Sequence, residues 1–141
     1  MDYFTRLFQS IVFQTVISGV LVFVIGEIVQ KFIIQPIYKH KGIIGEIDNK
    51  LKFYANIIAT PGVCSKEKES KCSNELRQLS CDLESSYKQL LFKCKNKSAK
   101  ISNSAKNLIG LSNGLDKPGN PNFNNATLVE QIRKDLDIPI L

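Results

Sequence analysis

The sequence has few of the residues on which most enzyme and metal sites depend. It contains one histidine, His40, in 141 residues. Its cysteines are widely separated: Cys64, Cys72, Cys81 and Cys94. Their spacings match no zinc or CxxC pattern. No Walker A, GxGxxG or HExxH motif is present, and no Ser/His/Asp or Cys/His set assembles around His40. We therefore expect no enzyme, and no catalytic, cofactor-binding or metal-binding residue.

Arginine is also scarce, which bears on nucleic-acid binding. The chain has 19 Lys+Arg against 13 Asp+Glu, a net charge of +6, yet its arginines are only Arg6, Arg77 and Arg133. Proteins that read a base sequence favour arginine, because its planar guanidinium makes bidentate contacts with base edges. The basic charge is therefore not expected to serve specific nucleic-acid binding.

One long apolar run is present near the amino terminus. No charged residue occurs from Leu7 to Gly26. A helix of that length is about 30 Å long, the thickness of the hydrocarbon core of a bilayer. The run is apolar on all sides, and the rest of the chain is too short to enclose it. We predict a transmembrane helix over residues 7–29 after a short tail, residues 1–6. A cleaved signal peptide is the competing interpretation, but no A-x-A site follows the run.

Basic residues on either side of the run predict its orientation. Three lysines follow it: Lys31, Lys39 and Lys41. Only Arg6 precedes it. The positive-inside rule then puts the amino terminus outside and the carboxy-terminal domain in the cytoplasm, with these lysines at the headgroups. In the cytoplasm the cysteines are expected to be reduced thiols. In the reverse orientation, by contrast, Cys64 and Cys72 would be able to form a disulfide.

Polar residues within the run form a narrow stripe. Ser10, Gln14 and Ser18 recur every four residues and so share one side of the predicted helix. Small and hydrogen-bonding residues on one side of a span favour association of helices in lipid. Self-association through this stripe is one hypothesis, and simple tolerance of isolated polar residues is the other.

The remainder of the chain shows helical periodicity. Apolar residues step by three and four along a predicted juxtamembrane helix over residues 30–60: Ile44, Ile47, Leu51, Tyr54 and Ile58. Similar patterns predict three further helices: one through Leu76–Leu90, one over about 105–115, and one over about 126–136 with Asn125 as its cap. The polar stretch at 65–75 is either the beginning of the first of these, with Ser65 or Ser70 as cap, or a mobile connection. Proline, glycine and asparagine mark a loop at 116–125. The fold class expected is all-α: one transmembrane helix that continues into a small cytoplasmic bundle, with residues 61–141 completing it.

Two groups of polar residues are candidate sites. The first group lies on or beside the apolar stripes: Glu46, Asn56, Arg77 and Asn113. Polar groups near a core need partners, so we consider an interhelical network with a Glu46–Arg77 contact, against the alternative of ordinary boundary residues. The second group is a run of lysines without an acid: Lys93, Lys95, Lys97 and Lys100. These lysines predict contact with an anionic surface, or else a solvated helix end whose dipole they complement.

Five short motifs follow one another along the chain. They read FxxxP, IGEI, YAN, LRxL with a later leucine, and LIGLSN, at Phe32–Pro36, Ile44–Ile47, Tyr54–Asn56, Leu76–Leu83 and Leu108–Asn113. Their order resembles that of a group of small, uncharacterised bacterial proteins with one amino-terminal span. The resemblance implies a single-pass protein of the bacterial inner membrane with a helical domain, and it implies no reaction. The chain departs from the group's pattern between Cys64 and Lys100.

Two functions agree with these features. The first is a non-enzymatic scaffold or docking module at the cytoplasmic face of a bacterial membrane. Its partners would be the lipid bilayer and either another protein or further copies of the chain. The alternative is a membrane-active, toxin-like effector whose spans oligomerise and perturb the bilayer.

Overall fold

A computed structural model describes residues 11–116 and 124–139, and the described part of the chain is helical, without strands. The helices are α2 (Ile11–Val29), η1 (Gln30–Ile34), α3 (Gln35–Phe53), α4 (Ala55–Ala59), α5 (Lys66–Lys88), α6 (Lys95–Asp116) and α7 (Asn125–Asp135). The predicted all-α class is confirmed. The tail at 1–6, with Arg6, lies outside the described residues, as do Ser10 and residues 117–123 of the predicted loop.

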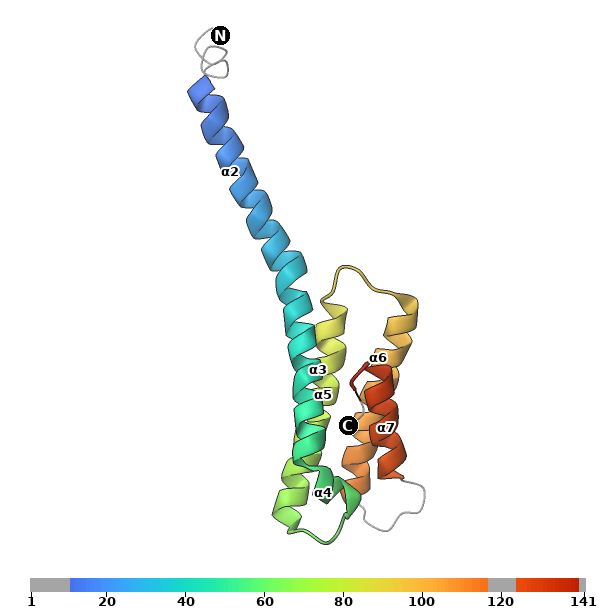
Figure 1. Ribbon diagram of the computed structural model, residues 1–141. Coiled ribbons are helices and arrows are strands. Elements are labelled where there is room, and N and C mark those ends of the chain that lie inside the picture. Colours follow the sequence, from blue (N-terminus) through green and yellow to red (C-terminus); the bar gives the residue numbers. More distant parts are fainter. Residues whose placement is uncertain (1–10, 117–123, 140–141) are drawn as a thin grey trace.

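The first three elements form one uninterrupted helix. It runs over 43 residues, from Ile11 to Phe53, and its amino-terminal part is long and apolar enough to cross a membrane. Figure 1 shows α2 extending well away from the other helices, which gather around α3. No residue of α2 is buried. A bare apolar helix of this kind is stable only where lipid or other protein covers it.

A proline lies inside this helix rather than at its start. Pro36 has no N–H, and in a regular α-helix its ring would clash with the carbonyl of Phe32. The chain avoids this clash because η1 is π-helical: the Gln35 N–H donates to the carbonyl of Gln30, five residues earlier. The wider turn accommodates the ring without a break. Pro36 therefore does not separate the apolar helix from the bundle.

The apolar stripe of α3 faces α5, as its periodicity predicts. Ile47 and Leu51 are buried, and the helix ends at Tyr54, where φ is −97° and ψ is 14°. The short helix α4 then places Ile58 in the same core. Sequence periodicity predicted one helix through Ile58, because the apolar spacing continues across the break at Tyr54.

Helices α5 and α6 pack closely along a row of small side chains. Ser80 Oγ donates to the carbonyl of Ala105 at 2.8 Å, and Ser73 Oγ lies 2.8 Å from Ser112 Oγ. Ser104 is also fully buried. Small residues let two helix backbones approach, and their hydroxyls pair with polar groups across the contact. Helix α6 begins at Lys95 and not near residue 105 as predicted, because its first turns carry serines and lysines instead of an apolar stripe.

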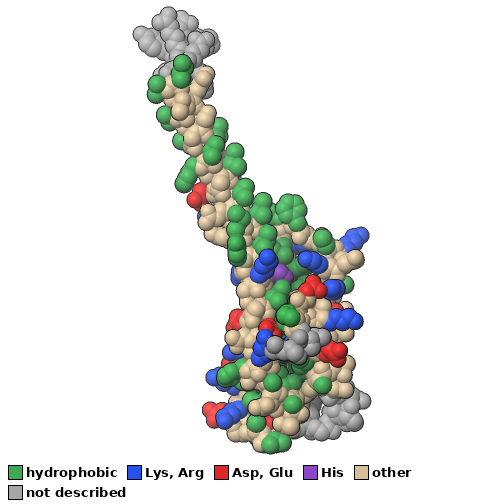
Figure 2. Space-filling model, in the orientation of Figure 1, with side chains coloured by type: hydrophobic (Ala, Val, Ile, Leu, Met, Phe, Trp, Pro, Cys, Tyr) green, Lys and Arg blue, Asp and Glu red, His purple; other side chains and the backbone are tan. Residues whose placement is uncertain are grey.

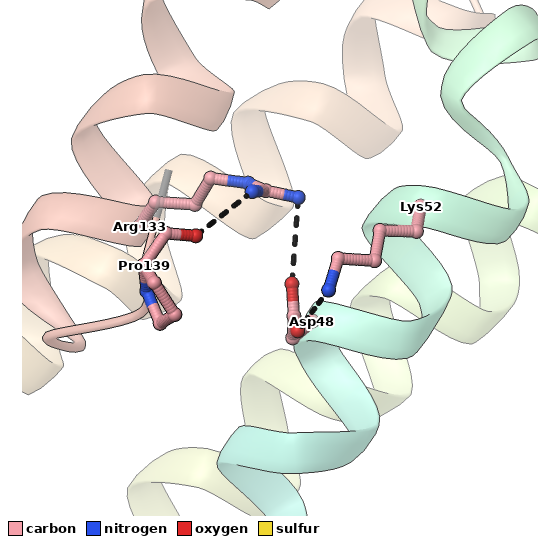
Figure 3. A network of polar contacts seen from close by, with 4 residues as sticks. All are labelled: Asp48, Lys52, Arg133 and Pro139. Atoms are coloured by element: carbon pink, nitrogen blue, oxygen red, sulfur yellow. Dashed lines mark hydrogen bonds and ion pairs between the residues drawn. The ribbon is translucent and has the colours of Figure 1, made fainter. Parts of the chain in front are cut away.

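The last helix closes the bundle from the other side. Asn124 caps α7 by accepting from the Thr127 N–H at 3.2 Å, while Asn125, the predicted cap, donates to the Ile58 carbonyl at 2.8 Å. Arg133 reaches from α7 to Asp48 of α3, where its guanidinium lies 3.4 Å from one carboxylate oxygen. Figure 3 shows this contact together with Lys52, whose amine is 2.7 Å from the other oxygen, and with the Pro139 carbonyl.

A pair of leucines tests which surfaces form the core. Leu108 is fully buried and Leu91 is 61% exposed. Leu108→Ala should lower the free energy of unfolding by about 2–5 kcal/mol, because it removes buried methyl groups and leaves a cavity. Leu91→Ala should change it by less than about 0.5 kcal/mol. Urea unfolding of the full chain in detergent micelles, followed by circular dichroism, measures both. Equal effects would contradict the described packing.

Candidate functional site

The end of the bundle nearest α2 brings together three elements. These are the first turns of α3, the end of α5 with the connection over residues 89–94, and the first turns of α6, all visible where the long helix meets the bundle in Figure 1. Two hydrogen bonds hold this end together. His40 Nδ1 lies 2.8 Å from Ser86 Oγ, and Tyr87 Oη donates to the Cys94 carbonyl at 3.0 Å. The first hydrogen bond joins the end of α5 to α3, and the second joins the connection to the end of α5.

His40, the only histidine, is buried in this end of the bundle. Ser86 Oγ also lies 3.0 Å from the Leu83 carbonyl, and the arrangement that satisfies both contacts has the serine donating to this carbonyl and the imidazole donating from Nδ1 to Ser86. Burial, together with the positive charge of Lys97, lowers the pKa of His40 from its ordinary value of 6.5. The ring is accordingly neutral near pH 7 and serves as a hydrogen-bond donor within the fold.

A cavity of about 330 Å³ opens beside His40. Apolar side chains from α3, the end of α5, α6 and the end of α7 form much of its wall: Ile37, Ile44, Leu90, Ile101 and Leu136. Lys41, Lys97 and Lys100 also line it, together with Asp137, whose carboxylate is 3.6 Å from the Lys100 amine. The cavity thus combines an apolar wall with positively charged groups.

The predicted lysine cluster lies at this end of the bundle. Lys93 stands in the connection after α5, and Lys95, Lys97 and Lys100 belong to the first turns of α6. All four are exposed, and the first turn of α6 contains no acid. The alternative that these lysines complement the negative end of a helix dipole is therefore wrong for Lys95, Lys97 and Lys100. They lie near the amino terminus of α6, where the helix dipole is itself positive. The arrangement raises the local positive potential.

Two exposed apolar residues beside these lysines were missed by sequence reasoning. Leu91 is 61% exposed and Phe92 is 78% exposed, and both lie in the connection between α5 and α6. The available signal was their place directly after the last periodic leucine of α5 and directly before a run of lysines.

The predicted interhelical network forms in part. Arg77 Nε donates to Ser112 Oγ at 2.6 Å, and its Nη2 donates to Asn113 Oδ1 at 2.9 Å, which joins α5 to α6. Glu46 and Asn56 are exposed and lie outside this network. The expected Glu46–Arg77 contact is not formed, because the arginine extends toward α6 rather than toward α3.

The residues predicted to act in or near the membrane are exposed. Gln14 and Ser18 lie on α2, Lys31 lies in η1, and Lys39 and Lys41 lie in the first turns of α3. Exposure leaves the two polar side chains of α2 accessible to neighbouring helices. It leaves the three lysines accessible to headgroups or solvent.

The four cysteines are free thiols, and Cys64 and Cys72 do not form a disulfide. Burial raises the pKa of Cys72 to about 12, so this thiol is unreactive near neutral pH. Cys81 and Cys94 are exposed. Among residues 11–116 and 124–139 no three His, Cys, Asp or Glu side chains are arranged to hold a metal ion.

Comparisons with known proteins do not identify this site. No family model, no curated protein and no solved structure matches the chain. The resemblance drawn from the order of the five motifs therefore stays a prediction.

The single histidine allows a direct test of the site. The pKa of His40, followed by NMR of the full chain in micelles, should lie below 6.5, with the neutral ring protonated at Nδ1. Lys97→Gln should raise this pKa only part of the way to 6.5, since burial is the larger cause. A pKa at or above 6.5 would contradict the described burial.

The same shift predicts a pH dependence of stability. The unfolded chain binds a proton near pH 6.5 and the folded chain only at lower pH, so the folded state is favoured fully above 6.5. Its stability should fall as pH decreases from 6.5 through the pKa of the folded state. His40→Gln keeps a hydrogen-bond donor, and it should remove this part of the slope in urea unfolding.

Proposed function

We propose that this protein is a non-enzymatic, single-pass membrane protein that holds a small helical bundle at the cytoplasmic face of a bacterial membrane, where the bundle acts as a scaffold or docking module. The observation that supports this most is the continuous helix from Ile11 to Phe53. Its first part is apolar and exposed on all sides, and its last part packs into the bundle core through Ile47 and Leu51. One rigid element thus serves both environments.

A continuous helix gives the bundle a defined position relative to the membrane. A flexible linker would let the bundle diffuse within the reach of its tether, whereas a helix transmits orientation as well as distance. A surface on the bundle is thereby presented at a constant height. This property suits a protein that receives a partner at the membrane.

The end of the bundle away from α2 offers a surface for a protein partner. A groove of about 400 Å³ lies between α4 and α7. Its polar lining residues are Glu130 and Arg133. The other lining residues are apolar: Leu51, Ala55, Ile58, Ala59, Ala126 and Val129. Apolar grooves with a few polar groups are common binding sites. We assign partner docking to this groove.

Native cysteines provide a test of the proposed topology. The full chain is expressed in a bacterial host, and spheroplasts are treated with a membrane-impermeant maleimide. Cys81 and Cys94 are exposed, so they should react only after the membrane is permeabilised. The Cys81→Ser/Cys94→Ser variant is the control: it should lose the labelling of the two exposed thiols and keep only that of the half-buried Cys64, since Cys72 is buried. Labelling of intact spheroplasts would contradict the cytoplasmic placement.

The alternative function draws on the same exposed helix. Because α2 buries none of its residues, its polar side chains Gln14 and Ser18 can meet those of other copies, as a membrane-active assembly would require. The oligomeric state in lipid nanodiscs separates the two functions. A monomer would exclude the effector. A defined oligomer that Gln14→Leu disrupts, and that also depolarises cells, would favour it over the docking module.

A further inference from the structure

The end of the bundle facing α2 carries a surface that we call the tip: Leu91, Phe92, Lys93, Lys95 and Lys97. Leu91 and Phe92 are 61% and 78% exposed and adjacent in the chain, and contiguous exposed apolar surface marks protein or membrane interaction sites when it is extensive. The three lysines of the tip are exposed, and none of them forms an ion pair within the described residues. The ammonium groups of these three lysines are therefore available to an external anion.

The tip lies at the level where the long helix leaves its bare apolar part. Phe92 lines the same cavity as Ile37 and Lys41 of α3, so it lies beside the first turns of α3, which include Pro36. Exposed apolar residues continue along the helix at this level: Phe32, Ile34, Ile37 and Tyr38. Figure 2 shows hydrophobic side chains gathered where the long helix joins the bundle, with Lys and Arg side chains close by.

The length of the helix gives the depth of the tip. The uncharged run from Leu7 to Gly26 matches the hydrocarbon core of a bilayer, about 30 Å thick. Pro36 follows Gly26 by ten residues, or about 15 Å of helix. The stretch from Glu27 to Pro36 therefore crosses the headgroup region, and the tip lies beside its end, on the membrane side of the bundle. Aromatic side chains such as Phe32 and Tyr38 are then at the membrane–water interface, where such residues are enriched.

We propose that the tip docks on anionic phospholipids of the leaflet from which the span emerges: Leu91 and Phe92 enter the interface between headgroups and acyl chains, and Lys93, Lys95 and Lys97 bind the phosphate-bearing headgroups. This inference rests on the proposed function, because it requires the span to cross the membrane. It adds a second point of attachment, which fixes the rotation and tilt of the bundle as well as its height.

Charge and rigidity favour lipid as the occupant. Lysines near an anionic membrane surface are attracted to it, and an apolar side chain beside them adds burial of its own area. The connection that carries Leu91 and Phe92 is held by the Tyr87–Cys94 hydrogen bond, and the end of α5 is held to α3 by His40 and Ser86. The tip is thus already in place on the side of the bundle that the helix turns toward the bilayer.

The absence of tryptophan from the chain makes the inference directly testable. Three single variants of the full chain each place one fluorophore at an exposed phenylalanine: Phe23→Trp in α2, Phe92→Trp in the tip, and Phe53→Trp at the far end of α3. Each is reconstituted in phosphatidylcholine vesicles with and without phosphatidylglycerol. Quenching by lipids brominated at different acyl positions then reports the depth of each tryptophan.

The expected pattern differs at each position. Phe23→Trp should be quenched by deeply brominated lipid in both compositions. Phe92→Trp should be blue-shifted and quenched by lipid brominated near the headgroup, and more strongly with phosphatidylglycerol. Phe53→Trp should be quenched in neither. Lys93→Gln, Lys95→Gln and Lys97→Gln together should abolish the effect of phosphatidylglycerol on Phe92→Trp, whereas the matched set Lys66→Gln, Lys68→Gln and Lys71→Gln should leave it unchanged.

The outcomes separate the inference from the proposed function. If Phe23→Trp is quenched but Phe92→Trp behaves like Phe53→Trp, the span stands and the docking of the tip is wrong. If Phe92→Trp is quenched equally in both compositions and the lysine variants have no effect, the assignment to anionic lipid is wrong. If Phe23→Trp is not quenched, the proposed membrane anchor is wrong, and the inference with it.

Discussion

The structure depends on one continuous helix, from Ile11 to Phe53, whose backbone hydrogen bonds change register at η1 and lack a donor only at Pro36. Within a bilayer the backbone polar groups have no water to pair with, so a spanning segment must satisfy them internally, and a helix does so. In the proposed arrangement the same helix continues beyond the membrane, so no joint is needed. Only the side chains change along it: they are apolar on all sides along α2 and apolar on one side along α3, where Ile47 and Leu51 meet the bundle.

The bundle is built around this helix by contacts of different kinds. Helix α5 packs on α3 with leucines and Tyr87, while α5 and α6 meet along serines that pair with one another and with carbonyls. Helix α7 lies on α6 and places Ile132 in the core, and the Arg133–Asp48 ion pair joins it to α3. Lys52 binds the same carboxylate. Salt weakens ion pairs, so it should affect this part of the contact of α7 more than the burial of Ile132.

Sequence periodicity was a good guide wherever an apolar stripe exists. Leu76, Leu79, Leu83 and Tyr87 predicted α5, and the run from Leu7 predicted a helix apolar on all sides. The start of α6 was missed, because lysines and serines from Lys95 to Ser104 show no stripe, and packing against α5 decides their conformation. The break at Tyr54 was missed for the opposite reason, since the apolar spacing passes through it unchanged.

Candidate site residues were predictable to a smaller extent. Arg77 and Asn113 were expected to pair with groups near the core and they do, but Glu46 is exposed although it neighbours the buried Ile47. Side chains at neighbouring helix positions differ in direction by about 100°. Apolar residues spaced by three and four do not show which of two neighbouring positions at the edge of the stripe is buried. Leu91 and Phe92 were not singled out, because they follow the last periodic leucine and only the tertiary structure shows that both side chains are exposed.

The π-helical turn at Gln30–Ile34 has a consequence for how the span and the bundle are phased. A π turn contains one residue more than the α turn it replaces, and one residue corresponds to about 100° of rotation around the helix axis. The side of α2 that any neighbour in the membrane meets is thus set relative to the bundle by this extra residue. Inserting or deleting a residue in the apolar run would therefore also rotate α2 about its axis relative to the bundle, by about 100°.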